Sequence, residues 1–295
     1  MAPPKQLITT HLGKNGPQVS PVGLRLMGAS GMYGNPASDN ERLAFLVPRI
    51  KWARRFGILV SDIYGDSEHL LGKWFAANPS KRKGIFLTTK FGHPKRDLAN
   101  LQGTRAMNTN PEYFHDALEA SLKRLGLPYI DLYYIHRLDR MEYNTFCLDI
   151  ESPKYKLLET ARDLGVAIVA YSPLGNGLLS GTLWSKEDFT KPGDLHGGMP
   201  WFSDDHFKTN LAIVDKIREI AKAKGVTAAQ FTLAWILAQG EDLFAILGTT
   251  KAHRVAENLG SLDIIVNPEQ GKVVGGRFPA AIMEYCFADT PPLEA

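Results

Sequence analysis

Short apolar runs alternate along this chain with segments of helical period, and this alternation limits the possible folds more than any other feature. The runs are rich in β-branched and aromatic residues, which is typical of strands buried in a parallel sheet. They occupy residues 85–90, 129–135, 166–171 and 243–247. The segments with apolar residues at helical spacing are 69–77, 111–125, 157–164, 211–220, 227–239 and 252–259. Such alternation, without a long antiparallel stretch, predicts a parallel α/β fold.

Two architectures fit a parallel α/β chain, a doubly wound sheet and a closed barrel. A doubly wound dinucleotide-binding sheet should carry G-x-G-x-x-G between its first strand and helix. The sequence has no such motif, and Gly175-Asn176-Gly177 follows a strand with the wrong spacing beyond it. No Pro/Ser-rich linker divides the chain, so we expect one domain over residues 1–295, with an irregular tail from about Asn267.

Composition and charge exclude several classes of protein. The 34 Lys and Arg residues against 31 Asp and Glu give a net charge of +3, which is too mild to favour nucleic acid or a membrane surface as a partner. The two cysteines, Cys147 and Cys286, have no metal-binding spacing and indicate free thiols in a reducing compartment. We see no apolar leader and no membrane-spanning run, so we expect a cytoplasmic protein. Because no metal-binding spacing occurs, we also expect no bound metal.

Polar side chains stand where the predicted strands end. Lys90 ends one strand and His136 the next, while Tyr64 stands in a turn before a helical segment. In a barrel these strand ends meet at one mouth, where the chemistry of such folds lies. A phenol there can donate a proton to a carbonyl oxygen, because a nearby ammonium favours the phenolate and an imidazole can hydrogen-bond the substrate. Each residue alone is more often a surface charge or a helix cap, so only their combination points to catalysis.

Five motifs, in this order, resemble the aldo-keto reductase superfamily. They are Tyr64-Gly-Asp-Ser-Glu68, Thr88-Thr-Lys90, Asp131-Leu-Tyr-Tyr-Ile-His136, Ala170-Tyr-Ser-Pro-Leu174 and the stretch from Gly248 to Asn258. The resemblance runs from about Leu12 to the C-terminus and is greatest to fungal pyridoxal-reductase-like and aryl-aldehyde reductases. It implies a (β/α)8 TIM barrel of the NADP-dependent oxidoreductase type. It also implies reduction of aldehydes or ketones to alcohols by hydride transfer from NADPH.

The resemblance assigns a role to each residue of these motifs. Tyr64 would be the general acid, Lys90 would lower the pKa of that phenol, and His136 would hydrogen-bond the substrate oxygen. Tyr171 would stack on the nicotinamide. The remaining cofactor residues would border the pyrophosphate (Ser172, Pro173, Leu174, Gly177), hold the 2′-phosphate and adenine end (Gly248, Thr249, Thr250, Lys251, Arg254) and close on the adenine (Glu257, Asn258). A loop that runs into a helix N-terminus after the last strand of a barrel is a natural phosphate site.

Three features depart from the family pattern. The family has an Asp five residues before the catalytic Tyr, where this chain has Leu59, so the resemblance leaves a triad instead of a tetrad. Arg25 stands where the family usually has a small residue, and a charge facing a barrel interior is costly unless it is paired. After Arg140 roughly 45 residues of barrel sequence are missing. We therefore expect a barrel that lacks one strand and its adjoining helices.

Two hypotheses of different classes follow from the sequence. The first is a working NADPH-dependent carbonyl reductase that acts on a small-molecule substrate. The second is a catalytically impaired relative, either regulatory-subunit-like or the product of a misassembled gene. In the misassembled case, about Val47 to Val60 would be translated out of frame and a coding segment would be skipped after Arg140. The sequence does not identify the carbonyl substrate or the oligomeric state, because the loops that select substrate are its least readable part.

Overall fold

The structure is a computed structural model of the 295-residue chain. It describes residues 8–30, 36–46, 56–61, 64–92, 108, 110–135, 157–189, 196, 202–249 and 251–267.

A six-stranded parallel sheet organises the described residues, with the strand order β6-β5-β4-β3-β8-β7. The strands are β3 (Val22–Arg25), β4 (Phe56–Leu59), β5 (Ile85–Phe91), β6 (Leu132–Ile135), β7 (Ile168–Tyr171) and β8 (Leu243–Gly248). Because β3 pairs with both β4 and β8, the first and last strands of this sheet in chain order meet in its middle, as they do when a (β/α)8 barrel closes. The sheet is the arc of an incomplete barrel, and β6 and β7 are its two ends.

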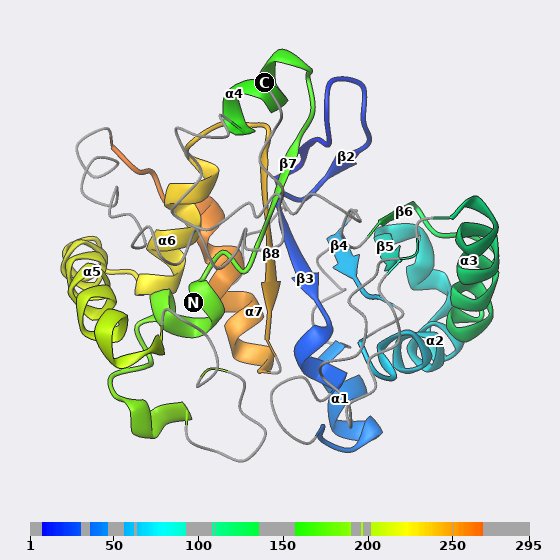
Figure 1. Cartoon of the computed structure of the whole chain (residues 1–295), viewed down its shortest axis with the longest axis horizontal. Coiled ribbons are helices and arrows are strands. Elements are labelled where there is room, and N and C mark those ends of the chain that lie inside the picture. The colour runs from blue at the N-terminus through cyan, green and yellow to red at the C-terminus, as the bar shows by residue number, and fades with distance from the viewer. Residues whose placement is uncertain are drawn as a thin grey trace.

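Helices cover the outside of this arc (Figure 1). Figure 1 shows α2 (Ser67–Ala77) and α3 (Pro111–Leu125) beside β4 to β6, and α5 (Asp204–Ala223) and α6 (Ala228–Leu237) on the opposite side. The helix α7 (Ala252–Leu259) follows β8 and lies near its carboxyl end. The remaining elements are β1 (Thr10–His11), β2 (Gln18–Val19), η1 (Met27–Ser30), α1 (Asp39–Leu46), η3 (Pro79–Gly84), α4 (Leu157–Asp163), η4 (Gly175–Ser180), η5 (Lys186–Phe189) and η8 (Gly260–Asp263).

Two apolar clusters hold the helices on the sheet. One joins β3, β4, β5 and β8 to α2, and its fully buried members include Ile58, Leu71 and Leu87. The other joins β7 to η4, α5 and α6 and includes Phe231 and Ile236. Burial of apolar area of this extent is the main favourable term in folding. It fixes the carboxyl ends of the strands, from which the site residues project.

Most of the expected elements form near the predicted residues. Asn110 caps α3 by accepting from the backbone N–H of Glu112 at 2.8 Å, and Gly126 ends that helix in the left-handed conformation. Thr227 begins α6 with a capping box shared with Gln230. The strand expected from Tyr129 starts only at Leu132, because the Asp131 carboxylate accepts from the backbone N–H of Leu87 at 2.8 Å. The helix expected from Leu211 already starts at Asp204, and Phe207, four residues before Leu211, extends its apolar face into the core.

Candidate active site

Tyr64 stands in the turn between β4 and α2. Its backbone N–H donates to the Ser61 carbonyl at 3.0 Å, and its own carbonyl accepts from the Ser67 N–H at 3.0 Å. Gly65 follows with φ +53°, and a Cβ on it would lie 2.8 Å from the Ser30 carbonyl oxygen. Only glycine combines this backbone conformation with such a close approach. The turn therefore holds the Tyr64 side chain, which is 1% exposed, in one position.

Two cationic side chains donate to the hydroxyl oxygen of Tyr64. The Lys90 ammonium, at the end of β5, donates from 3.4 Å. The Arg25 guanidinium, at the end of β3, donates through Nε from 3.0 Å. Both cations also lie near the face of the phenol ring, 5.1 Å and 5.2 Å from its centroid. The structure thus brings together Tyr64 and Lys90 of the predicted triad, whereas His136 lies outside the described residues.

A second phenol, that of Tyr134 on β6, borders the same ammonium. The Lys90 nitrogen lies 5.3 Å from the centroid of the Tyr134 ring. Burial raises the pKa of the Tyr134 hydroxyl well above its ordinary value, and the neighbouring Tyr64 adds to this effect. The Tyr134 phenol therefore stays protonated at physiological pH. It places a neutral aromatic ring beside the Lys90 ammonium.

A buried carboxylate fixes the two elements that carry Tyr64 and Lys90. Glu68, in the first turn of α2, is 2% exposed and accepts from the Thr89 hydroxyl at 2.6 Å. Its other oxygen accepts from Arg124 Nε on α3, also at 2.6 Å. Thr89 precedes Lys90 on β5, so this network ties the start of α2 to the strand that ends at the ammonium. Buried and fully paired networks of this kind rigidify their surroundings.

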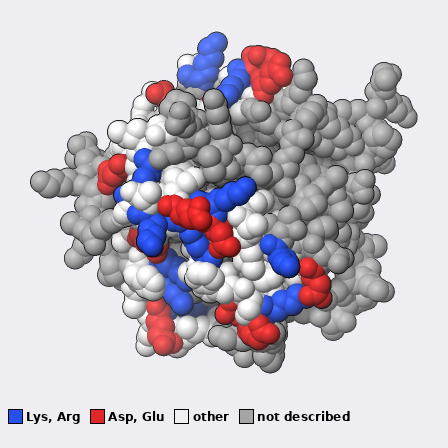
Figure 2. Space-filling view, turned by 90° about the vertical axis from the view of Figure 1, so that its left-hand side faces the viewer, with Lys and Arg blue, Asp and Glu red and all other residues white. Residues whose placement is uncertain are grey.

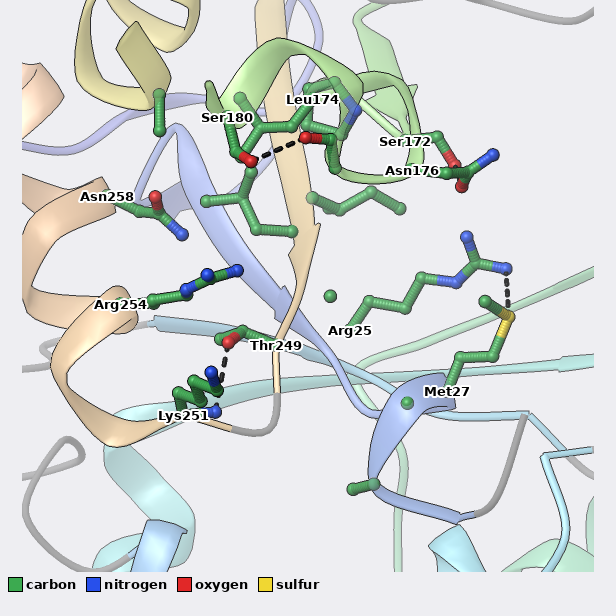
Figure 3. A pocket seen from close by; sticks show the side chains of 18 of the residues that line it. Arg25, Met27, Ser172, Leu174, Asn176, Ser180, Thr249, Lys251, Arg254 and Asn258 are labelled. Atoms are coloured by element: carbon green, nitrogen blue, oxygen red, sulfur yellow. Dashed lines mark hydrogen bonds between the residues drawn. The ribbon is translucent and has the colours of Figure 1, made fainter. Parts of the chain in front are cut away.

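A cavity of about 600 Å³ opens beside this cluster, at the carboxyl ends of β3, β7 and β8. Figure 3 shows that Ser172, Leu174, Asn176 and Ser180 border it on one side and Arg254 and Asn258, from α7, on another. Arg25 and Met27 also border it, and the Arg25 side chain links the cavity to Tyr64 through its hydrogen bond. All of the predicted cofactor residues line this one cavity except Tyr171, which ends β7, and Thr250, which lies outside the described residues.

The end of the cavity at α7 suits an anion. Lys251 and Arg254 contribute positive charge there, and Lys251 is exposed. The N-cap residue of α7 is Lys251, which gives the helix no side-chain cap, and no acidic residue occurs in its first turn. The first N–H groups of an uncapped helix favour negative charge. A phosphate would meet the positive end of the helix and two cationic side chains at once.

The loop that follows β7 carries features that sequence reasoning missed. Ser172 and Asn176 have positive φ angles of 50° and 53°, although neither residue is glycine. The Ser172 hydroxyl donates to the Asn176 side-chain oxygen at 3.3 Å, and a ring nitrogen of His196 lies 2.7 Å from the Asn176 carbonyl oxygen. Asn176 and His196 both line the cavity. The only signal in the sequence was Asn176 between two glycines, because asparagine tolerates the left-handed conformation.

The described residues contain no group of three or more His, Cys, Asp or Glu side chains that could hold a metal ion. The donors that converge on the site are cationic and phenolic instead.

The sequence and the geometry agree with one known family. The family model for the aldo/keto reductase family matches this chain over residues 58–151 and 140–273. The chain belongs to the aldo/keto reductase family. Membership makes it an oxidoreductase of a family that acts on small carbonyl compounds, and the expectation drawn from the motifs is confirmed at that level.

Curated aldo-keto reductases match most of the chain. The protein named aldo-keto reductase yakc [NADP(+)], from Schizosaccharomyces pombe, is 32% identical, and the match covers 93% of this chain and 96% of that protein. Aldo-keto reductase str7 from Strobilurus tenacellus is 37% identical over 84% of each chain. The first alignment spans 333 positions although this chain has 295 residues, so that relative contains segments that have no counterpart here. This agrees with the expected gap in the barrel.

Solved structures show the same fold. A glycerol dehydrogenase from Gluconobacter oxydans superposes with a TM-score of 0.71 at 20% identity and covers 98% of both chains. A thermostable aldo-keto reductase in complex with an inhibitor gives a TM-score of 0.65 at 23% identity and covers 91% of this chain and 99% of that one. At these identities the likeness establishes the fold alone.

This aldo-keto reductase departs from the family pattern at two adjacent places. Leu59 on β4, where the family has Asp, pairs in register with Arg25 on β3 and with Thr88 on β5. It is 4% exposed and apolar, so it contributes no charge to the site. Arg25 had been expected to be costly unless paired, and the structure pairs it with Tyr64. The charge that borders Tyr64 on this side is thus positive, where the family pattern would place a carboxylate.

An ion pair close to Tyr64 in the chain makes the stability of the fold depend on pH. Both Nη atoms of Arg42 donate to the Asp66 carboxylate, each at 2.7 Å, and this hydrogen bond lowers the pKa of Asp66 below its ordinary value of 3.8. A carboxyl whose folded pKa is lowered contributes stability in full above its unfolded pKa and loses it as the pH falls through the folded value.

We expect the melting temperature of the chain to fall as the pH drops below about 4, and to fall less steeply in Asp66→Asn. Thermal melts between pH 2 and 7 test this, with Asp215→Asn on α5 as a control; parallel curves for Asp66→Asn and the native chain would contradict it.

Proposed function

We propose that this aldo-keto reductase reduces small aldehydes or ketones to alcohols with NADPH, and that Tyr64 is its general acid. One observation carries the proposal. The Tyr64 oxygen lies 3.4 Å from the Lys90 ammonium, beside a cavity whose far end holds Lys251 and Arg254. Arg25, which donates to the Tyr64 oxygen, lines this cavity, so the proton donor lies behind the cavity wall and the anion site lies within the cavity. A proton donor close to a cofactor-sized cavity with an anion site is what a nicotinamide-dependent carbonyl reductase needs.

The proton chemistry follows from the charges on Tyr64. A phenol with its ordinary pKa of ~10 is a weak acid at neutral pH. Cations at hydrogen-bond distance favour the phenolate and make the proton easier to give away. Tyr64 would donate this proton to the oxygen of the carbonyl while the bound NADPH supplies hydride to the carbon. His136, which lies outside the described residues, stays a prediction for hydrogen-bonding the same oxygen.

The residues around the cavity fit a dinucleotide with an additional phosphate. At Gly248, a Cβ would meet only the Arg25 carbonyl oxygen, at 4.0 Å, so the strand end leaves open space beside the cavity. Gly177 has φ +100°, which lets the loop after β7 turn along the rim. Lys251 and Arg254 at the uncapped end of α7 would hold the 2′-phosphate, with Glu257 and Asn258 toward the adenine. The name of the Schizosaccharomyces pombe relative also specifies NADP(+).

The described part of one face gives no reason to add nucleic acid to this proposal (Figure 2). Figure 2 shows that Lys and Arg are interspersed with Asp and Glu on the described part of the face that it draws. A mixed surface of this kind does not create the single-sign field that nucleic acid requires. No helix in the described part of the chain is long and apolar enough to cross a membrane. A small carbonyl compound as substrate and a cytoplasmic location remain predictions.

The purified full chain tests the proposal directly. We expect it to oxidise NADPH in the presence of 4-nitrobenzaldehyde or pyridoxal, followed by loss of NADPH absorbance, with the corresponding alcohol identified by chromatography. NADPH without aldehyde is the blank, and NADH tests the choice of cofactor. A chain that binds NADPH but forms no alcohol from any of a panel of aldehydes and ketones would contradict the proposed activity.

A further inference from the structure

Arg25 is a charged side chain that contacts the Tyr64 oxygen and that the family pattern does not explain. Its Nε donates to the Tyr64 oxygen at 3.0 Å, which is shorter than the contact from Lys90. We propose that Arg25 is a further catalytic residue of this chain, which together with Lys90 stabilises the phenolate that Tyr64 becomes on donating its proton. This inference rests on the proposed function, because it concerns the same proton transfer.

Tyr64 and Met27 are the hydrogen-bond partners of the Arg25 guanidinium among the described residues. Its Nη2 donates to the Met27 sulfur at 3.0 Å, and a thioether is only a weak acceptor. Among the described residues no carboxylate pairs with it, and its neighbours in the sheet are the uncharged Leu59 and Gly248. A partly buried guanidinium that lacks an anion is costly. An anionic oxygen at Tyr64 would relieve that cost, so Arg25 favours the charged form of the phenol.

The geometry at the oxygen fits this role. A phenol oxygen accepts through its lone pairs and donates through its own O–H. Arg25 and Lys90 both approach as donors, from β3 and β5, and neither can accept the Tyr64 proton. Donation by Tyr64 therefore has to go to another group, which in the reaction is the carbonyl oxygen. The two contacts then strengthen, because hydrogen bonds from cations to an anion are stronger than those to a neutral oxygen.

In this step the Tyr64 O–H bond would break and a new O–H bond would form on the substrate oxygen. Bound NADPH would supply the hydride for the carbonyl carbon and leave as NADP+. The phenolate that remains lies between two cations. It recovers its proton from water after the alcohol leaves, so Arg25 ends the cycle unchanged.

Direct titration of the Tyr64 phenol tests the inference without cofactor or substrate. The ultraviolet absorbance of phenolate is followed against pH in the native chain, in Arg25→Met and in Arg25→Lys. The matching Tyr64→Phe background is subtracted from each. We expect Arg25→Met to move the Tyr64 midpoint upward by about 1–3 pH units, and Arg25→Lys to restore part of that shift. Equal midpoints for the native chain and Arg25→Met would overturn the inference. If Arg25→Met does not fold, as judged by circular dichroism, Arg25→Gln takes its place.

Steady-state kinetics distinguish a catalytic role of Arg25 from steric blocking of the site by its side chain. If Arg25 stabilises the phenolate, Arg25→Met lowers kcat at saturating NADPH and moves the pH profile of kcat upward. Arg25→Gly introduces the small residue of the family pattern, and a higher kcat in that variant would show that Arg25 blocks the site, which overturns the inference. Absence of turnover in the native chain would count against the proposed function alone, because the phenol titration still decides the role of Arg25.

Discussion

Replacement of Tyr64 by phenylalanine is expected to abolish carbonyl reduction by this chain. The change removes only the hydroxyl, whose oxygen lies 3.0 Å from Arg25 and 3.4 Å from Lys90. General acid catalysis contributes about 10²–10⁴-fold to such reactions, so we expect kcat to fall by that factor. The fold should survive, because the buried ring remains in place. The measurement is kcat with 4-nitrobenzaldehyde at saturating NADPH.

A control and a binding measurement make this result specific. Tyr129→Phe removes a hydroxyl from a side chain that is 44% exposed, and we expect normal turnover from it. Tyr64→Phe should still bind NADPH with nearly the affinity of the native chain, because the cofactor residues line a cavity that Tyr64 does not border. Unchanged kcat in Tyr64→Phe would remove Tyr64 from the mechanism. Loss of both kcat and NADPH binding would indicate damage to the fold instead.

Local signals made most of the helices predictable. Pro111 after Asn110 and Gly126 at the end define α3 because capping and helix termination depend on residues that are close in the chain. The same holds for Thr227 and Gln230 at the start of α6. The start at Asp204 was missed although Ser203 is a preferred N-cap residue type, and the Ser203 side chain makes no cap hydrogen bond there. Sequence therefore predicts best the elements whose ends carry their own hydrogen bonds.

Contacts between distant residues were beyond the reach of the sequence alone. Arg25 could be recognised as a departure from the family, but its bond to Tyr64 joins residues 39 positions apart on different elements. Glu68 could be read as part of a motif, but its pairing with Arg124 spans 56 positions. Such pairs are formed by the packing of the sheet and its helices, for which a single sequence holds no local signal. The cavity residues were placed by resemblance, and their convergence was seen only in three dimensions.

The two edges of the sheet were predicted in part by the sequence and are located by the structure. The departure after Arg140 predicted a missing strand, and the described strands form an arc with β6 at one end and β7 at the other. Of the residues that separate these two strands in the chain, 136–156 lie outside the described residues. An edge strand whose outer side is not paired exposes backbone donors and acceptors, which a closed barrel avoids. Tyr64, Lys90 and the lining of the cavity lie within the described arc, at the ends of β3, β4, β5, β7 and β8.

The second large effect is expected at the anion end of the cavity. Lys251→Ala combined with Arg254→Ala should weaken the binding of NADPH far more than that of NADH, since the two cofactors differ only by the 2′-phosphate. Hydrogen bonds to charged groups are worth about 1.5–3 kcal/mol each. Because Lys251 is exposed and its charge is screened by solvent, we expect the lower end of this range and a loss of roughly 10²-fold in NADPH affinity. The dissociation constants of both cofactors are measured by fluorescence titration.

A matched double variant separates this site from a general effect of charge. Lys216→Ala with Lys222→Ala removes two positive charges from the exposed face of α5 and should leave both dissociation constants unchanged. The selective loss should also shrink as salt is added, because salt screens the attraction between the phosphate and the two cations. Equal weakening of NADPH and NADH by the α7 variant would place the 2′-phosphate elsewhere. The uncapped N-terminus of α7 would remain in that variant, so a residual preference for NADPH is expected and measures what the helix itself contributes.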